Sequence, residues 1–391
     1  MAYQAVKRPR FIIDYLSWWR SLGLIYPTHI WNGSLTSTHS GYAGVNNSEM
    51  EKEIISKVIG LNPTSQGMVD YITLSNGMNH GFNYMMGCNA KLNILDTNIV
   101  GVLGHNIVSA GGENADVSFS WKGIDSTGNA VWPNMVGGTS DLGDDIMINC
   151  ESSDAESPNI QPISDGFFLR SVYSTSNLYP EIGVSGIQPN IRDIDLTLGT
   201  TDDEQRTTLF TPIKIGSFIW GRYYNMPHSP DLRLTMTREM DGVKRVRTKD
   251  GADLVKHQYL KSPKWGDLAA WELHDPTTAM PNQALSRVGR RTWDLSFTLQ
   301  ESDAFPDVNS LTNYGTSGYS DGEDDITENT LLEDNSFFGQ VIHKTQGLPF
   351  IFQPDKDYPE FAICKFDMNS FQFNQVANGV YNIKLKIREV W

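Results

Sequence analysis

His105 is a residue that could take part in catalysis. It stands between Gly104 and Asn106, and an imidazole that acts as a base needs a nucleophile or a carboxylate partner. No such partner stands at a diagnostic spacing in the sequence. We therefore predict a structural histidine in a turn, with a catalytic or ligand-binding role as the less favoured alternative.

His228, Asp231 and Glu239 could be imagined around a metal ion. One histidine with scattered acids lacks the ligand spacing of a zinc or other transition-metal site. Pro227 and Pro230 flank His228 and favour a turn at the entry to a strand. We predict such a turn, and we assign no catalytic, cofactor-binding or metal-binding residue in the chain.

Three acidic clusters offer the hard oxygen ligands that calcium accepts. None of them matches the spacing of a calcium-binding loop of the EF-hand type. We expect solvated loops, with a structural calcium ion as the alternative. The clusters are Asp141, Asp144 and Asp145; Asp202, Asp203 and Glu204; and Asp321, Glu323, Asp324 and Asp325.

Lys244, Arg245, Arg247 and Lys249 form a basic strip in an acidic protein. Such a strip could face an acidic neighbour in a ring, or DNA that passes through a lumen. A charged strand edge that discourages aggregation explains it equally well. The strip is therefore an interface candidate with two alternatives left open.

Aromatic side chains near predicted loops could stack on sugar rings. The candidates for glycan contact are Trp121, Trp132, Tyr173 and Tyr179. The chain holds 10 Trp residues, so most of them must serve as anchors of a core or an interface. Glycan binding is the less favoured prediction.

The N-terminal segment is rich in large apolar residues, among them Phe11, Trp18 and Trp19. Leaving such groups in water is costly, so the segment must pack on its own domain or on a neighbouring subunit. We favour its own domain and keep the three residues as interface candidates. Further along, Ser48 and Glu51 form a capping box that predicts a short amphipathic helix ending at Gly60.

Size and composition indicate a mainly β protein of two or three domains. The chain has 391 residues with 34 Gly and 18 Pro, a content that favours many short strands joined by turns. The net charge of −15 argues against a general nucleic-acid or membrane-surface binder. Cys88, Cys150 and Cys364 lack a paired motif and are expected to be free thiols made in a reducing compartment. No apolar run reaches the length of a membrane span, so a soluble protein is expected.

The strand pattern predicts two β-domains after an N-terminal arm with a short helix, residues 1–82. Residues 83–220 are predicted to form a β-sandwich of the jelly-roll type, and residues 221–391 a second antiparallel β-domain with an acidic loop at 301–336. In the second domain, Asp241-Gly242 predicts a hairpin between 232–237 and 243–248, and Asn378-Gly379 predicts a terminal hairpin with a type I′ turn. Candidate strands in the first domain are 91–102, 115–121, 145–149, 166–173, 191–198 and 213–220.

Several stretches resemble proteins of bacteriophage tails. Residues 99–112, IVGVLGHNIVSAGG, are similar to a strand and turn in the galactose-binding-like jelly rolls of minor tail proteins, and residues 216–242 to the segment that follows it. The last hundred residues resemble distal-tail and minor-tail proteins in layout. The stretches that carry this resemblance are RTWDL at 291–295, Phe337-Phe338, GLPF at 347–350 and the closing REVW at 388–391.

The resemblance implies a structural protein of the virion tail that is made in the host bacterial cytoplasm and is not an enzyme. It implies a homo-oligomeric ring, with six-fold symmetry favoured, and contacts with other tail proteins. No membrane is involved, and DNA would be met only in passage through the lumen. The alternatives are a carbohydrate-binding module for host adsorption, which would contact a surface glycan, and a glycan-cleaving tail enzyme with two working carboxylates.

Overall fold

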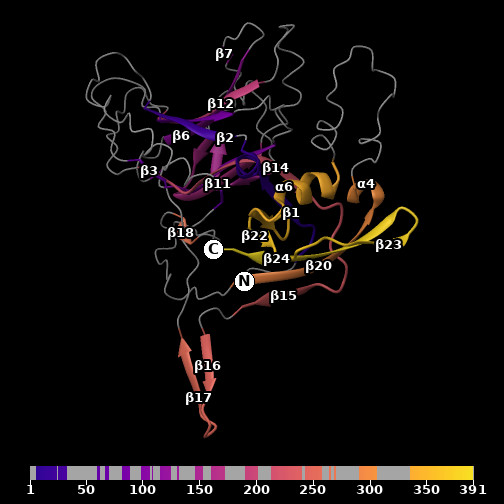
Figure 1. Ribbon diagram of the computed structural model, residues 1–391. Helices are drawn as coiled ribbons and strands as arrows, with labels where there is room; N and C mark the ends of the chain where they lie inside the picture. The colour runs from indigo at the N-terminus through magenta and orange to yellow at the C-terminus, as the bar shows by residue number, and fades with distance from the viewer. Residues whose placement is uncertain are drawn as a thin grey trace. The chain divides into compact units, whose positions relative to one another are not determined.

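The computed structural model of the chain is mainly β, with antiparallel strands and few short helices (Figure 1). Backbone and side chains are described for residues 6–23, 60–61, 98–105, 108, 146–151, 160–171, 216–239, 244–256, 290–305 and 335–390. The backbone alone is described for 25–32, 67–69, 82–88, 115–124, 130–131, 152, 190–200, 213–215, 243, 257, 264–265 and 268–269. The chain forms two compact units: unit 1 is 1–13, 224–263 and 269–391, and unit 2 is 14–223 and 264–268.

Unit 1 is built on an antiparallel sheet in which the first residues of the chain lie beside its last strands. Its strand order is β15-β20-β24-β22-β21-β1, with β23 also paired to β24. The strands are β15 (Thr235–Arg238), β20 (Arg291–Gln300), β24 (Val380–Glu389), β22 (Ala362–Phe366), β21 (Phe350–Gln353), β1 (Arg10–Asp14) and β23 (Phe373–Ala377).

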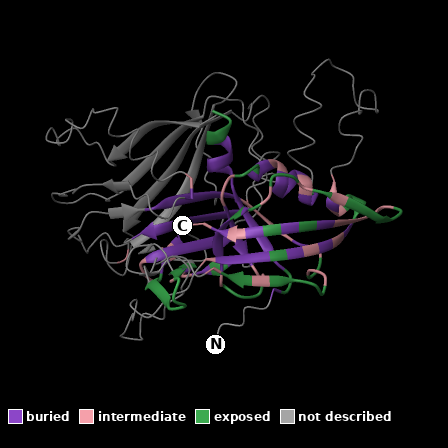
Figure 2. Ribbon diagram, turned by 60° about the horizontal axis from the view of Figure 1, so that its bottom comes forward, coloured by how far each residue is buried: buried purple, intermediate pink, exposed green. Residues whose placement is uncertain are grey.

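Alternation of apolar and polar residues gives this sheet one buried face. Along β20 the buried residues Trp293, Leu295 and Phe297 alternate with Asp294, Ser296 and Thr298, which are exposed or partly exposed. Their register partners on β24 are Ile387, Leu385 and Ile383, which are buried too. Figure 2 shows buried and exposed residues alternating along these strands. The period of two therefore places one apolar face against a core.

Short helical segments complete unit 1. The π-helix η3 (Phe338–Ile342) runs into α6 (His343–Thr345), and α4 (Glu301–Ala304) follows β20 directly. Val341 and the preceding Phe337 are fully buried, so this segment packs into the core of unit 1. Most of the predicted acidic loop, 306–334, lies outside the described residues.

Unit 2 contains two larger groups of antiparallel strands. In the first, β5 (Ile99–His105) lies between β14 (Ser217–Asn225, of which the last two residues belong to unit 1) and β11 (Gly166–Ser171), and β8 (Met147–Ile148) follows β11. The second has the order β2-β4-β12-β6-β10-β9, with β7 paired to β6. Its strands are β2 (Ile25–Asn32), β4 (Phe82–Cys88), β12 (Asn190–Thr200), β6 (Ala115–Ile124), β10 (Ile160–Pro162), β9 (Cys150–Ser152) and β7 (Ala130–Val131).

Smaller elements complete the described chain. The strand β13 (Ile213–Ile215) pairs with β3 (Gly67–Val69), and β18 (Lys264–Trp265) pairs with β19 (Leu268–Ala269). The helix α1 (Tyr15–Ser21) follows β1 directly. The helix predicted at the Ser48-Glu51 capping box lies outside the described residues. In the described part of the chain, no helix has the length and the apolar character needed to cross a membrane.

Most predicted strands are confirmed, but two turn predictions need correction. The hairpin predicted through Asp241-Gly242 does not form, because β15 pairs with β20, and β16 (Val243–Arg247) pairs with β17 (Asp253–His257). The terminal hairpin between β23 and β24 is confirmed. Its turn is not type I′, because Gly379 has a φ of 67° whereas Asn378 has no positive φ. The register of the two strands shifts between Gln375 and Ala377.

Candidate functional site

Phe11, an interface candidate, lies at the centre of the aromatic core of unit 1. It is fully buried on β1, and β1 pairs with β21 in the register Phe11 to Phe352. The centroid of its ring lies 5.5 Å from that of Phe337, 5.6 Å from Phe350, 5.3 Å from Phe352 and 6.1 Å from Phe366. The N-terminal segment therefore packs on its own unit, the arrangement that we favoured from the sequence.

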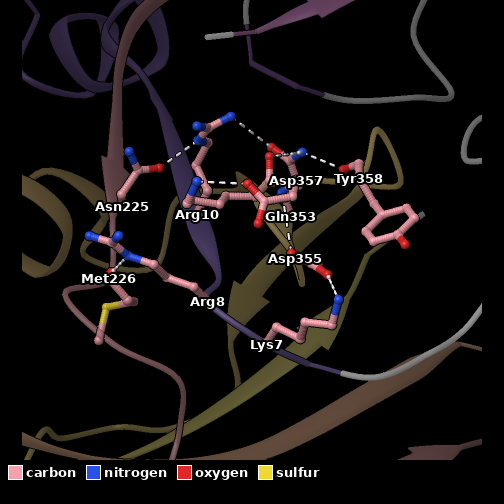
Figure 3. A network of polar contacts seen from close by, with 10 residues as sticks. Lys7, Arg8, Arg10, Asn225, Met226, Gln353, Asp355, Asp357 and Tyr358 are labelled. Carbon is pink, nitrogen blue, oxygen red and sulfur yellow. Dashed lines mark hydrogen bonds and ion pairs between the residues drawn. The ribbon is translucent and has the colours of Figure 1, made fainter.

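A set of polar contacts holds the segment before β1 in the same place (Figure 3). Arg8 donates from Nε to the carbonyl oxygen of Met226 (2.5 Å), and Arg10 donates from Nε to Oδ1 of Asn225 (2.6 Å). On the other side, Lys7 forms an ion pair with Asp355 (3.1 Å), and Arg10 reaches Oε1 of Gln353 (3.4 Å). Figure 3 shows Arg8 and Arg10 between these two segments. The guanidinium groups of Arg8 and Arg10 therefore donate hydrogen bonds within unit 1.

Trp18 and Trp19 lie on α1 in unit 2, and both are buried. Their helix begins where the side chain of Asp14 accepts hydrogen bonds from the backbone N–H groups of Leu16 (3.3 Å) and Ser17 (3.0 Å). The ring of Tyr15 packs against both indoles, at 6.0 Å and 5.6 Å between centroids. A neighbouring subunit could reach either indole only if this core opened.

The predicted basic strip lies on a two-stranded ribbon formed by β16, β17 and the turn between them, residues 243–257. We call it the basic ribbon. The described side chains from Lys244 to Lys256 are all exposed except that of Thr248, which is partly exposed. In Figure 1 the ribbon stands away from the β15-β20-β24 sheet of its own unit. Among the described residues, none of Lys244, Arg245, Arg247 and Lys249 has an ion-pair partner.

The turn of the basic ribbon is well defined. Thr248 donates from its backbone N–H to the carbonyl oxygen of Ala252 (2.8 Å), and the N–H of Ala252 donates to Oγ1 of Thr248 (3.0 Å). Gly251 supplies the positive φ of 87° that the turn requires. These local bonds set the register of the two strands. They thereby fix the positions of Lys244, Arg245 and Arg247 on β16 and of Lys249 in the turn.

The basic ribbon also exposes apolar side chains, which the sequence interpretation missed. Val246 and Leu254 are register partners, so they share a face, and they are 60% and 59% exposed. Val255, opposite Arg245, is 42% exposed on the other face. Val243 and Val246 stand among the cations of 243–247 in the sequence. The sequence could not reveal that neither face is covered within the described part of the chain.

His228, Asp231 and Glu239 are each engaged in contacts that a metal ion would have to displace. His228 hydrogen bonds to the carbonyl oxygens of Ser229 and Thr298, both at 2.8 Å. Asp231 accepts from Ser296 Oγ (2.8 Å) and Asn382 Nδ2 (3.1 Å). These bonds hold the irregular segment that leads into β15.

Glu239 binds an arginine of the same sheet. Its carboxylate receives Arg388 Nε at 3.0 Å and Nη2 at 2.6 Å, and the hydrogen bond from Arg388 lowers the pKa of Glu239. In the described part of the chain, no group of three or more His, Cys, Asp or Glu residues is arranged to hold a metal ion. The three acidic clusters considered for calcium lie outside it.

Three further candidate groups, His105, Cys150 and Cys364, are buried. His105 ends β5, lies with its ring edge-on to Phe168 at 5.4 Å, and burial lowers its pKa to about 3. Burial raises the pKa of the Cys150 thiol to about 12 and that of the Cys364 thiol well above its ordinary value. Both cysteines are free, as predicted. These neutral, enclosed groups are parts of cores.

Most of the glycan candidates lie outside the described residues. Trp132, Tyr173 and Tyr179 are among the residues that the structure does not describe. Trp121 lies on β6, where it is the register partner of Ile194 on β12, and only its backbone is described. The prediction of glycan contact stays a prediction.

Comparisons of the chain with protein-family models, with curated proteins and with solved structures find no match.

Proposed function

We propose that this chain is a structural protein of a tailed-phage virion, of the distal-tail or minor-tail type, whose copies join into a ring that connects parts of the tail. In this proposal residues 83–220 form a galactose-binding-like jelly roll. The virion role rests on the resemblance of residues 99–112 and 216–242 to tail proteins. The antiparallel β architecture is compatible with it.

The basic ribbon is the observation that carries the proposal of assembly. It presents cations and apolar side chains together, on both faces of an exposed two-stranded element. Exposed apolar groups beside uncompensated charges are typical of surfaces that meet a partner. A catalytic role has less support, because His105, Cys150 and Cys364 are buried and the other candidates, His228, Asp231 and Glu239, are engaged in structural contacts.

Open strand edges offer additional surface for assembly. β15 is the last strand in the order of its sheet, and the four residues Thr235–Arg238 pair only with β20 among the described strands. β23 pairs only with β24 among them, and its Val376 is 59% exposed. Unpaired edges can accept a strand or a loop from another copy. A closed ring arises when one patch repeatedly meets a different patch and the rotation closes.

The mass of the purified chain in solution tests this function. Sedimentation velocity, with negative-stain microscopy of the same sample, should show a ring, and six copies are expected. A chain that stays monomeric at all concentrations and binds host polysaccharide would instead support an adsorption module, and release of sugar would support an enzyme. Placement of the chain in an image of the assembled particle would then test its position in the tail.

A further inference from the structure

Among the residues that the structure describes, nothing packs on the basic ribbon in the way that a two-stranded element needs for stability. Two strands by themselves are marginally stable in water, and a third strand or a packed face is usually required. Within the described part of the chain, β16 pairs with β17 and with no other strand. The side chains on both faces of the ribbon are exposed. A partner that covers one face would supply the missing packing.

The apolar residues of the ribbon distinguish a protein partner from a nucleic acid. Val246 and Leu254 form a cross-strand apolar pair, and the next register pair on the same face consists of the exposed cations Lys244 and Lys256. Phosphate groups would be bound by the cations alone. A protein surface that is apolar at its centre and acidic around it would match the whole face.

The charge of the chain indicates which protein is the partner of the basic ribbon. Residues 243–257 contain five Lys or Arg residues and two Asp residues, a net charge of +3, whereas the whole chain carries −15. All other residues together therefore carry −18. The rest of a second copy thus carries a net charge opposite in sign to that of the basic ribbon, and the two attract each other. Like-charged copies would repel one another in the absence of such a local contact.

We propose that the basic ribbon docks on the acidic surface of a second copy of this chain, with the Val246-Leu254 face at the centre of the contact. This inference rests on the proposed function, because it names the element through which copies join in the ring. The contact is heterologous, since the ribbon of one copy meets a different patch of the next.

Charge reversal on the ribbon of the full chain tests the inference. K244E/K256E inverts the two cations on the face of Val246 and Leu254, and V246T/L254T makes the apolar pair polar with β-branched residues that suit a strand. The matched control K365E/K384E makes the same change of charge at exposed lysines of β22 and β24. Circular dichroism and thermal melting report whether each variant folds like the wild type.

Association is measured by sedimentation velocity over a range of protein concentrations and at roughly 0.05 M and 0.5 M salt. We expect each ribbon variant to raise the dissociation constant of assembly by about tenfold or more, while the control stays close to the wild type. High salt should weaken assembly of the wild type and of the control.

The outcomes separate this inference from the function on which it rests. If the wild type forms rings and both ribbon variants form them equally well, the inference is wrong and the proposed function stands. If the wild type remains monomeric, both fail. Binding of a short DNA duplex that K244E/K256E abolishes, with assembly unchanged, would assign the ribbon to nucleic acid and would also overturn the inference.

Discussion

Asp14 combines a helix cap with a fully enclosed carboxylate. Its oxygens accept hydrogen bonds from the hydroxyl and the backbone N–H of Ser17, from the N–H of Leu16 and from the N–H of Trp220 on β14. Burial nevertheless raises the pKa of Asp14 from 3.8 to about 6, against the opposite effect of these bonds. The cost of removing the charge from water therefore outweighs the capping network.

The raised pKa of Asp14 predicts a fall in stability with rising pH. The unfolded chain loses the proton near pH 4 and the folded chain near pH 6, so the contribution to stability is complete below pH 4 and is lost between pH 4 and 6. The loss is at most about 3 kcal/mol. The side chain at position 14 of D14N does not titrate. The free energy of unfolding of D14N, measured by urea denaturation, should therefore rise relative to that of the wild type between pH 4 and 6. If the free energies of unfolding of D14N and of the wild type changed in parallel with pH, the prediction would be contradicted.

Arg291 and Glu389 form a buried ion pair between β20 and β24. Arg291 donates from its backbone N–H (2.8 Å) and from Nε (3.3 Å) to Oε2 of Glu389, and from Nη2 to Oε1 (3.2 Å). Its Nη1 reaches Glu360, a partly exposed residue, at 2.6 Å. Burial alone would lower the pKa of Arg291, but the two carboxylates outweigh it and raise the pKa.

Removing the buried carboxylate should cost more than removing the exposed one. E389Q leaves the guanidinium enclosed with one ionic partner, and we expect a loss of about 2–4 kcal/mol in the free energy of unfolding. E360Q removes the partner that water can replace, and should cost less than about 1 kcal/mol. Chemical denaturation at pH 7 compares the two variants. Equal losses would show that burial of the pair does not govern its contribution.

At the scale of elements, the terminal hairpin depends on one glycine. Gly379 has a positive φ, and a Cβ placed there would have Oε2 of Glu301 as its nearest neighbour at 3.7 Å, so the backbone conformation and not the space restricts this position. G379A should therefore cost about 1 kcal/mol or somewhat more. N378A should stay within roughly 0.5 kcal/mol, because Asn378 has no positive φ. A large loss of stability for N378A in thermal unfolding would support the type I′ turn that the sequence predicted.

The packing of β5 against β11 depends on a glycine for a different reason. A Cβ at Gly101 would lie 2.5 Å from the carbonyl oxygen of Phe168 and 2.6 Å from Cδ2 of Leu169. We expect G101A to destabilise the protein by about 2–4 kcal/mol. Gly23 is the control, because it has open space and a φ of 72°, so G23A should show backbone strain alone, about 1 kcal/mol. Calorimetry of both variants separates crowding from strain.

For the molecule as a whole, the sequence predicted what is local and missed what depends on distant partners. The alternation of Ile383, Leu385 and Ile387 with lysines identified β24, because a period of two is written in one segment. The pairing of β15 with β20 instead of β16 could not be read in the same way, since several strands alternate equally well. Likewise, the sequence favoured burial of Phe11 in its own domain, but it could not identify Phe337, Phe350 and Phe352 as the rings that surround it.

The same limit applies to the candidate site. The basic strip was evident from charge alone, whereas the exposure of Val246 and Leu254 required knowledge of which strand pairs with which. Glu239 and Asp231 looked like loose acids until the structure placed Arg388 and Ser296 beside them. Partners that are far apart in the sequence therefore decided the interpretation of each polar residue.

The place of residues 1–13 in unit 1 leads to a final prediction, that the core of this unit depends on the beginning of the chain. Phe11 is fully buried among Phe337, Phe350 and Phe352, all more than 300 positions away. F11A in the full chain should cost about 3–5 kcal/mol. L22A, at a residue that is 54% exposed, should cost less than about 1 kcal/mol. Hydrogen exchange should show faster opening of β21 and β22 in F11A, because these strands lose the ring that packs between their aromatic residues. Unchanged exchange in both strands would show that the first residues are dispensable for the core of unit 1.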